Sequence, residues 1–312
     1  MRALIGQGHE VIVIDTLSSG HRQNVPCDAE LIKTNVGNPD LAQKLAGLAG
    51  GQIDAVFHLA AQIDVRKSVE DPAADANANI METLKLLGLC RDLQVKRFVF
   101  ASSGGAIYGQ PQRIPTKEND LENPGNPYGV AKLAIEKYLH VFHQLHGLSY
   151  ASLRLSNVYG PFQNSEGEAG VVAIFARKII ADELPVIYGN GQQTRDFVYV
   201  GDVVRAMMLG MESNVIGPCN ISTASETTVY QVCRYLQNIA GDKAEPLYRP
   251  ARLGEQMRSC LDYSKAYSEM GWRPQFDIEE GLRKTFEWFS EKSTSRDKRE
   301  AAPCGIVHLT KL

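Results

Sequence analysis

The chain has 312 residues, 44% of them hydrophobic and 22% charged, which is enough to bury a full core without disulfides or metals. Its net charge of −3 at pH 7 argues against electrostatic attraction to nucleic acid or to an anionic membrane. The six cysteines are scattered, no apolar run is long enough to cross a bilayer and no signal-peptide pattern opens the chain, so we expect a cytoplasmic protein with reduced thiols.

The first half of the chain alternates short apolar runs with helix-like segments. Residues 11–14, 55–59 and 97–101 form runs that end at small or polar residues, as buried parallel strands do. Residues 79–93 and 128–146 read instead as helices, with leucines among their apolar positions. Strands that alternate with helices predict a doubly wound α/β sheet.

The pattern changes after about residue 160. A turn at 189–191, a strand-like run at 196–200 and a helical run at 228–239 predict a smaller α/β lobe. The strand at 151–155 still belongs to the first domain, so we expect the lobe to be interleaved with the sheet. The expected divisions are a first domain over 1–160, a smaller lobe mainly over 161–290 and an irregular tail over 291–312.

Tyr128 and Lys132 lie four residues apart at the start of a predicted helix, so their side chains face the same side. An ammonium a few ångströms from a phenol favours the phenolate, and we expect Lys132 to lower the pKa of Tyr128 from about 10 towards neutrality. Tyr128 would then be a general base for a hydroxyl proton. Ser102 and Ser103 directly follow a predicted strand, where parallel-sheet enzymes hold their ligands. These residues together predict a site that handles protons.

The motifs that surround these residues occur in a recognisable order. They are the segments 100–109, 126–132, 154–161, 189–200 and 271–274. In this order they resemble the NAD-dependent epimerase/dehydratase family, within the extended short-chain dehydrogenases. The resemblance covers nearly the whole chain, from residue 1 to about 290, and implies a dinucleotide-binding first domain and a substrate-binding lobe. It also implies a nucleotide-sugar 4-epimerase of the UDP-glucose/UDP-galactose type that uses NAD.

The resemblance implies a role for each residue of the catalytic motif. Tyr128 would remove the proton of the sugar 4-hydroxyl while hydride passes to the nicotinamide. Lys132 would lower the pKa of that phenol and hold the nicotinamide ribose. A serine at the strand end, Ser103 in preference to Ser102, would hydrogen-bond the reacting oxygen. The 4-keto intermediate would then turn over and take the hydride back on its other face.

The same resemblance implies where the UDP-sugar would bind. Asn157 would contact the sugar or the diphosphate, and Arg195 would pair with the diphosphate because a guanidinium suits phosphate geometry. Arg252 and Glu255 would lie by the uridine. Ser259 stands where the family modulates pocket volume, and its small side chain would admit an N-acetylated sugar.

The residues after the strand serine help to choose among the reactions of the family. Dehydratases and decarboxylases of the family carry acidic residues there, and a dehydratase needs an acid to expel a hydroxyl as water. This chain has Gly104 and Gly105, which favours epimerisation. The alternatives are another nucleotide-sugar epimerase, acting on a glucuronate or an N-acetyl sugar, and a truncated homologue that binds a nucleotide sugar without catalysis.

Asp15 ends a predicted strand, where a carboxylate hydrogen-bonds an adenosine ribose and repels a 2′-phosphate, so NAD is favoured over NADP. The resemblance implies further cofactor contacts. Asn35 and Val36 would lie beside the adenine, and Asn79 would lie near the cofactor. The segment under the pyrophosphate would be Leu59, Ala60 and Ala61.

The start of the chain lacks the usual dinucleotide fingerprint, which needs a strand, a glycine-rich turn and a helix before the acid. Only fourteen residues precede Asp15, and Gly6-Gln7-Gly8 stands directly before its strand, which predicts a helix C-cap and turn. We therefore expect an N-terminally truncated Rossmann-like fold with unpaired strand edges and with weak or absent NAD binding.

Two further predictions concern helices. In the family, the helices that correspond to 79–93 and 132–146 form a homodimeric four-helix bundle, so a homodimer is implied. His140, His143 and His146 share one helix, but the third has turned away from the first two and no acid or cysteine joins them. We therefore expect no metal site.

Overall fold

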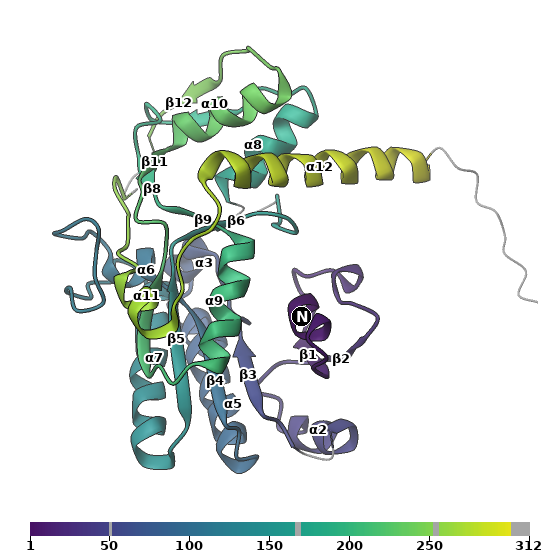
Figure 1. The fold of residues 1–312 in the computed structure, drawn as a ribbon, viewed down its shortest axis with the longest axis vertical. Coiled ribbons are helices and arrows are strands. Elements are labelled where there is room, and N and C mark those ends of the chain that lie inside the picture. Colours follow the sequence, from purple (N-terminus) through teal and green to yellow (C-terminus); the bar gives the residue numbers. More distant parts are fainter. Residues whose placement is uncertain (50–51, 166–169, 252–255, 301–312) are drawn as a thin grey trace, which may run out of the picture.

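The computed structural model describes residues 1–49, 52–165, 170–251 and 256–300. Its centre is a parallel sheet of four strands in the order β10-β5-β4-β3 (Figure 1). The strands are β3 (Ala55–His58), β4 (Arg97–Ser103), β5 (Ser149–Leu155) and β10 (Gly217–Ile221). The structure therefore confirms the predicted α/β class and the first-half strands.

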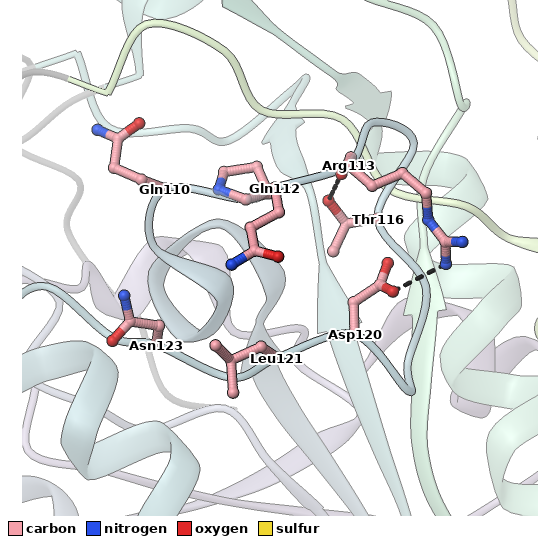
Figure 2. A pocket seen from close by; sticks show the side chains of 8 residues that line it. Gln110, Gln112, Arg113, Thr116, Asp120, Leu121 and Asn123 are labelled. Carbon is pink, nitrogen blue, oxygen red and sulfur yellow. Dashed lines mark hydrogen bonds and ion pairs between the residues drawn. The ribbon is translucent and has the colours of Figure 1, made fainter.

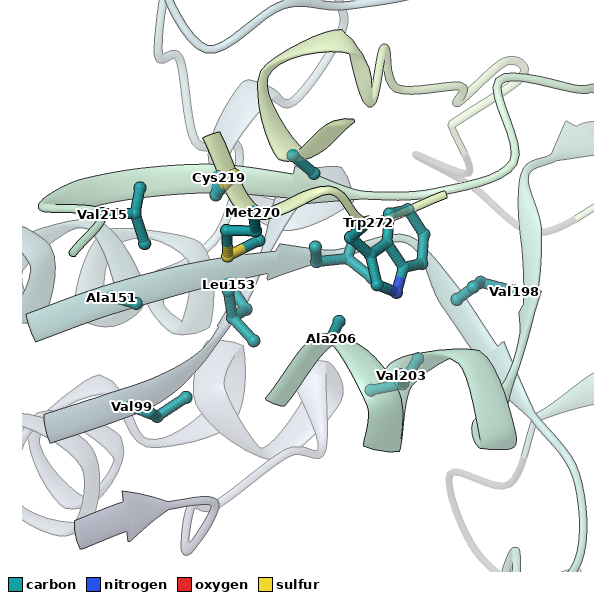
Figure 3. Packing of buried hydrophobic residues seen from close by; sticks show 12 residues of the cluster. Val99, Ala151, Leu153, Val198, Val203, Ala206, Val215, Cys219, Met270 and Trp272 are labelled. Atoms are coloured by element: carbon teal, nitrogen blue, oxygen red, sulfur yellow. The ribbon is translucent and has the colours of Figure 1, made fainter. Parts of the chain in front are cut away.

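Side chains of β4 alternate between two hydrophobic layers, because successive residues of a strand point to opposite faces. Phe98 and Phe100 are buried against α5 (Glu82–Asp92) and α7 (Pro127–His146). Val99 belongs to the other layer, where β5 packs against α9 (Val200–Glu212) and β10 against α11 (Ser264–Met270), with Trp272 fully buried among them (Figure 3). Helices on both faces account for the nearly continuous burial of β4 and β5.

A separate two-stranded parallel sheet is formed by the N-terminal segment, where β1 (Val11–Asp15) pairs with β2 (Ala29–Lys33). The helices around it are α1 (Arg2–Gly6), the 3-10 turn η1 (Arg22–Asn24) and α2 (Leu41–Ala49). Gly8, at φ +85°, makes the predicted turn between α1 and β1. In the described part of the chain β1 pairs only with β2 and β3 only with β4, so each has an unpaired edge, as expected.

The second half of the chain forms a lobe of short strand pairs and helices. The pairs are β6 (Asn157–Tyr159) with β9 (Phe197–Tyr199), β7 (Val186–Tyr188) with β12 (Leu247–Arg249), and β8 (Thr194–Arg195) with β11 (Thr227–Thr228). Helices α8 (Val171–Ile180), α10 (Val229–Ala240) and α12 (Ile278–Glu300) pack together beside them. The chain returns to the central sheet at β10, which pairs with β5.

The prediction of an irregular tail over 291–312 is wrong for its first ten residues. Helix α12 continues to Glu300 and extends past the lobe (Figure 1). The segment 291–300 is rich in lysine, arginine and glutamate, which favour helix, and extending an existing helix needs no new nucleus. Residues 301–312 lie outside the described residues.

No helix among the described residues combines the length and the apolar character that crossing a membrane requires.

Candidate active site

The first turn of α7 brings Tyr128 to the end of β4. Asn126 caps the helix by accepting a hydrogen bond from the amide of Gly129 at 2.9 Å, and Pro127 occupies the first turn. A Cβ on Gly129 would lie only 2.5 Å from the carbonyl oxygen of Ala106 in α6 (Gly104–Tyr108). Glycine at this position therefore allows the close approach of α7 to α6 that places Tyr128.

The two serines at the end of β4 have different partners. Ser103 makes a side-chain hydrogen bond with Tyr128. Ser102 is buried and donates to Oε1 of Glu136 at 2.6 Å. Of the two hydroxyls, that of Ser103 is the one beside the phenol, which supports the preference for Ser103.

Lys132 is buried, and among the described residues no hydrogen bond joins its ammonium to the Tyr128 hydroxyl. Its Nζ donates to the carbonyl of Ala101 at 2.9 Å and lies 5.6 Å from the centroid of the Tyr128 ring. Burial raises the pKa of Tyr128 to about 12, against the opposing hydrogen bond from Ser103. The expected lowering of this pKa is therefore wrong for the structure as it stands, because desolvation of the phenolate outweighs a cation placed over the ring.

A buried charge network lies behind the motif. Arg154 of β5 is fully buried and binds both carboxylate oxygens of Glu136, with Nη2 at 2.6 Å from Oε2. It also donates to the hydroxyl of Tyr108 at 2.8 Å and pairs with Glu122. Glu136 escaped the sequence analysis, although its place one turn after Lys132 on the same helix face was a usable signal.

The predicted cofactor residues gather at the carboxyl ends of the parallel strands β1, β2 and β3. Asp15 is exposed at the end of β1, and its Oδ1 accepts from the amide of Leu17 at 2.7 Å. Asn35 is exposed just after β2, and Val36 beside it is partly buried. Leu59 and Ala60 are exposed after β3, with Ala61 partly exposed. These ends are where α/β sheets hold ligands, so the residues fit a dinucleotide.

Asn79 is placed differently from the other predicted cofactor residues. It is 2% exposed and lies in η2 (Asn77–Met81), one turn of π-helix that leads into α5. Its amide group accepts from the backbone N–H of Gln62 at 2.8 Å and donates to the carbonyl of the same residue at 3.0 Å. Asn79 thus holds the loop that follows β3, and its direct contact with a cofactor stays a prediction.

Two of the predicted substrate residues lie close together. The backbone N–H of Asn157, at the start of β6, donates to the backbone carbonyl of Asp196 at 2.9 Å. Arg195, the last residue of β8, directly precedes Asp196. The carboxylate of Asp196 is buried and accepts from the amides of Thr223, Ala224 and Leu261. Asp196 was missed by the sequence analysis, and it joins three segments around the substrate residues. Arg252 and Glu255 lie outside the described residues.

Gly104 and Gly105 leave this side of the site without an acid. A Cβ on Gly104 would lie 2.3 Å from Cδ1 of Leu261, so a larger side chain there would require Leu261 to shift. A Cβ on Gly105 would lie 3.5 Å from Oγ of Ser259, an ordinary contact distance. Elimination of water therefore has no proton donor at either position.

The pocket of about 230 Å³ in the loop 110–123 is not part of this site (Figure 2). Its charged groups pair with each other, Arg113 with Asp120 at 2.8 Å, and Thr116 donates to the carbonyl of Arg113 at 2.9 Å. None of the predicted site residues lines it. Within the described residues, no group of three or more histidine, cysteine or acidic side chains could hold a metal ion.

Comparison with known proteins shows similarity along most of the chain. The model of the NAD dependent epimerase/dehydratase family matches residues 1–222. The UDP-glucose 4-epimerase of Mycolicibacterium smegmatis is 38% identical over 296 residues, which cover 93% of this chain and 94% of that protein.

Solved structures show the same similarity along most of the chain. UDP-glucose 4-epimerase of Thermotoga maritima, crystallised with UDP-glucose, superposes with a TM-score of 0.90 at 43% identity and covers 94% of both chains. UDP-glucose 4-epimerase of Thermus thermophilus in complex with NAD gives a TM-score of 0.86 at 37% identity, over 92% of this chain and 93% of that one.

Proposed function

This chain belongs to the NAD-dependent epimerase/dehydratase family, and we propose that it interconverts UDP-glucose and UDP-galactose by transient oxidation at the sugar 4-position. The observation that carries the proposal is the hydrogen-bonded pair of Tyr128 and Ser103, with Lys132 one helical turn away, at the end of β4. Gly104 and Gly105 support epimerisation over elimination, because neither supplies an acid.

Each residue has a task in this reaction. Tyr128 accepts the proton of the sugar 4-hydroxyl and later returns it, and Ser103 hydrogen-bonds the same oxygen. NAD, when bound, would supply the hydride acceptor. Asp15 holds its adenosine ribose and Lys132 its nicotinamide ribose, while Asn157 and Arg195 hold the sugar diphosphate. The 4-keto sugar turns over within this frame and is reduced on its other face.

The test is a coupled assay of UDP-glucose formation from UDP-galactose, with the absorbance of co-purified NAD(H) measured on the same sample. We expect turnover by the wild-type chain and a loss of about 10²–10⁴-fold in kcat for Tyr128→Phe, because that variant lacks the general base. Nucleotide-sugar binding without turnover would instead identify a non-catalytic homologue. Full activity of Tyr128→Phe would refute the mechanism.

A second substrate is favoured by one observation. Ser259 is buried beside Gly105, and neither residue places a large side chain at this side of the site, which supports a site that admits an N-acetyl group. The same assay with UDP-N-acetylglucosamine, on the wild type and on Ser259→Tyr, tests this. We expect the tyrosine to reduce kcat/KM for the N-acetylated sugar more than for UDP-galactose. Equal losses for the two sugars would exclude this role.

We also propose a homodimer through α5 and α7. Four apolar side chains on α7 are 42–71% exposed, and their spacings, close to whole helical turns, put them on one face. They are Val130, Tyr138, Val141 and Leu145. Met81, just before α5, is 48% exposed as well. A stripe of this kind on a helix is typical of a helix–helix interface.

A reducing compartment such as the cytoplasm suits the cysteines. The five cysteines of the described residues carry free thiols. Four of them are buried, and burial raises the pKa of the Cys90 thiol to about 12, so it stays an unreactive thiol.

A further inference from the structure

Asp75 is a buried carboxylate beside the site, and the proposed reaction gives it no role. It is 2% exposed and lies in α4 (Pro72–Ala76). Its Oδ1 accepts from Nε2 of Gln62 at 2.9 Å and from Nδ2 of Asn79 at 3.0 Å. Its Oδ2 is buried without a hydrogen-bond partner. An ionised carboxylate in such surroundings requires a nearby positive charge.

Lys132 is the cation that matches this carboxylate. It is 3% exposed, and its ammonium, which has three donors, makes a hydrogen bond only to the carbonyl of Ala101 among the described residues. Asp75 acts electrostatically on both Lys132 and Tyr128, so it lies within range of the pair. Helix α4 and the neighbouring α3 (Val65–Glu70) pack against α7, which carries both residues.

The other titratable groups around Lys132 are already occupied or uncharged. Glu136, one turn further along α7, is bound by Arg154 and Ser102. His58 on β3 is buried, and burial lowers its pKa to about 3, so it is neutral near pH 7. Tyr128 is also neutral in this state, since burial raises its pKa. Asp75 is thus the carboxylate near Lys132 whose charge no arginine offsets.

We propose that Asp75 is the counter-ion of Lys132 and a positioning residue of the site. It keeps the ammonium charged where water does not reach it. Through Gln62 and Asn79 it also ties the loop after β3 to the helix that carries Tyr128. The inference deepens the proposed function, on which its kinetic consequence rests.

The electrostatics predict the direction in which the pKa values of Lys132 and Tyr128 change when Asp75 loses its charge. Burial lowers the pKa of Lys132 to about 8, and Asp75 and Glu136 oppose that fall. Asp75 likewise raises the pKa of Tyr128. Removing its negative charge therefore lowers both values, since a nearby anion favours the protonated form of each group.

The direct test is Asp75→Asn, which removes the charge and keeps the shape. We expect the Lys132 resonance, in a lysine-labelled NMR titration of the full chain, to titrate lower than in the wild type by on the order of one pH unit. In the holoenzyme both limbs of the kcat/KM pH profile should move the same way, the acidic limb with Tyr128 and the basic limb with Lys132. Asp92→Asn, at an exposed ion pair with Arg91, should move neither.

An unchanged Lys132 titration in Asp75→Asn would overturn the inference. A drop in kcat with both limbs unmoved would also overturn it, because that is what a purely structural role predicts. If the wild-type chain shows no turnover, the proposed function fails, and the NMR titration still decides the role of Asp75.

A stability measurement covers the case in which Asp75→Asn does not fold. Lys132→Met leaves Asp75 as a buried unpaired carboxylate, which is destabilising. Adding Asp75→Asn to that variant removes the unpaired charge, so the double variant should have a higher Tm than Lys132→Met alone. A lower Tm for the double variant would show that the two charges are not coupled.

Discussion

At the residue scale, Ser102 and Ser103 are adjacent in sequence but have different partners. Ser103→Ala removes the hydrogen bond to Tyr128, and we expect it to lower kcat about 10²-fold with little change in Tm. Ser102→Ala removes a donor from the buried Glu136 carboxylate, and we expect about 1–3 kcal/mol of destabilisation with kcat nearly kept. The pair is measured by epimerase kinetics and urea unfolding. The reverse pattern would assign the catalytic hydroxyl to Ser102.

His58 is a second residue whose burial has a measurable consequence. The pKa of His58 in the folded chain is about 3, below the usual value of 6.5. Between these two pH values the unfolded chain therefore binds a proton at this residue that the folded chain does not bind. Its contribution to stability is complete above pH 6.5 and is lost as the pH falls towards 3, at about 1.4 kcal/mol per pH unit. His58→Asn should flatten the pH dependence of the free energy of unfolding by that slope. Equal slopes in both proteins would contradict it.

The residue-scale predictions from the sequence succeeded where the relation was local. Tyr128 and Lys132 share a helix, so their common side followed from their spacing. The pKa of Tyr128 was predicted in the wrong direction, because spacing does not show burial or where the ammonium points. Asp75 was not predicted, since nothing in the sequence near residue 75 shows that α4 packs against α7.

At the scale of elements, α7 presents different residues to the interior and to the outside. Lys132, Ile135, Glu136 and Leu139 are buried against the sheet, while Tyr138 and Leu145 are exposed. The apolar pattern predicted that this segment is a helix. The exposed apolar stripe could be recognised only once the sheet had shown which face is buried.

The exposed apolar stripe on α7 leads to a prediction about the proposed dimer. A charge introduced by Leu145→Asp into an apolar interface is costly, so we expect it to shift a dimer towards monomer. Light scattering at several concentrations measures the shift. Leu121→Asp, equally exposed but in the loop before α7, is the matched control and should leave the mass unchanged. A dimer that survives Leu145→Asp would place the interface elsewhere.

At the scale of the whole molecule, the proposed cofactor links two sheets. Asp15 lies on the β1–β2 sheet, whereas Tyr128 and Lys132 lie beside the β10-β5-β4-β3 sheet (Figure 1). A ligand that binds both parts stabilises the folded chain, by about 2.7 kcal/mol when its concentration is 100 times Kd. NAD that binds both parts should therefore raise the Tm of the chain, whereas an unchanged Tm would support the weak or absent NAD binding expected from the missing dinucleotide fingerprint.

Asp15→Asn tests that link. A tenfold loss of NAD affinity would reduce the stabilisation by about 1.4 kcal/mol, and the preference for NAD over NADP should weaken because the charge that repels a 2′-phosphate is gone. Asp28→Asn, an exposed carboxylate in the segment before β2, is the control. A thermal shift with NAD that is the same in both variants would show that Asp15 does not hold the ribose.

The sequence by itself determined the alternation of strands and helices, and the helix that places Tyr128 and Lys132 on one side, because periodicity and capping act over a few residues. Only the tertiary structure decided which serine meets Tyr128, that Glu136 belongs to Arg154, and that Asp75 lies near Lys132. It also decided that the phenol is desolvated enough to raise its pKa. These facts depend on which elements pack together, and burial and charge pairing arise only from that packing.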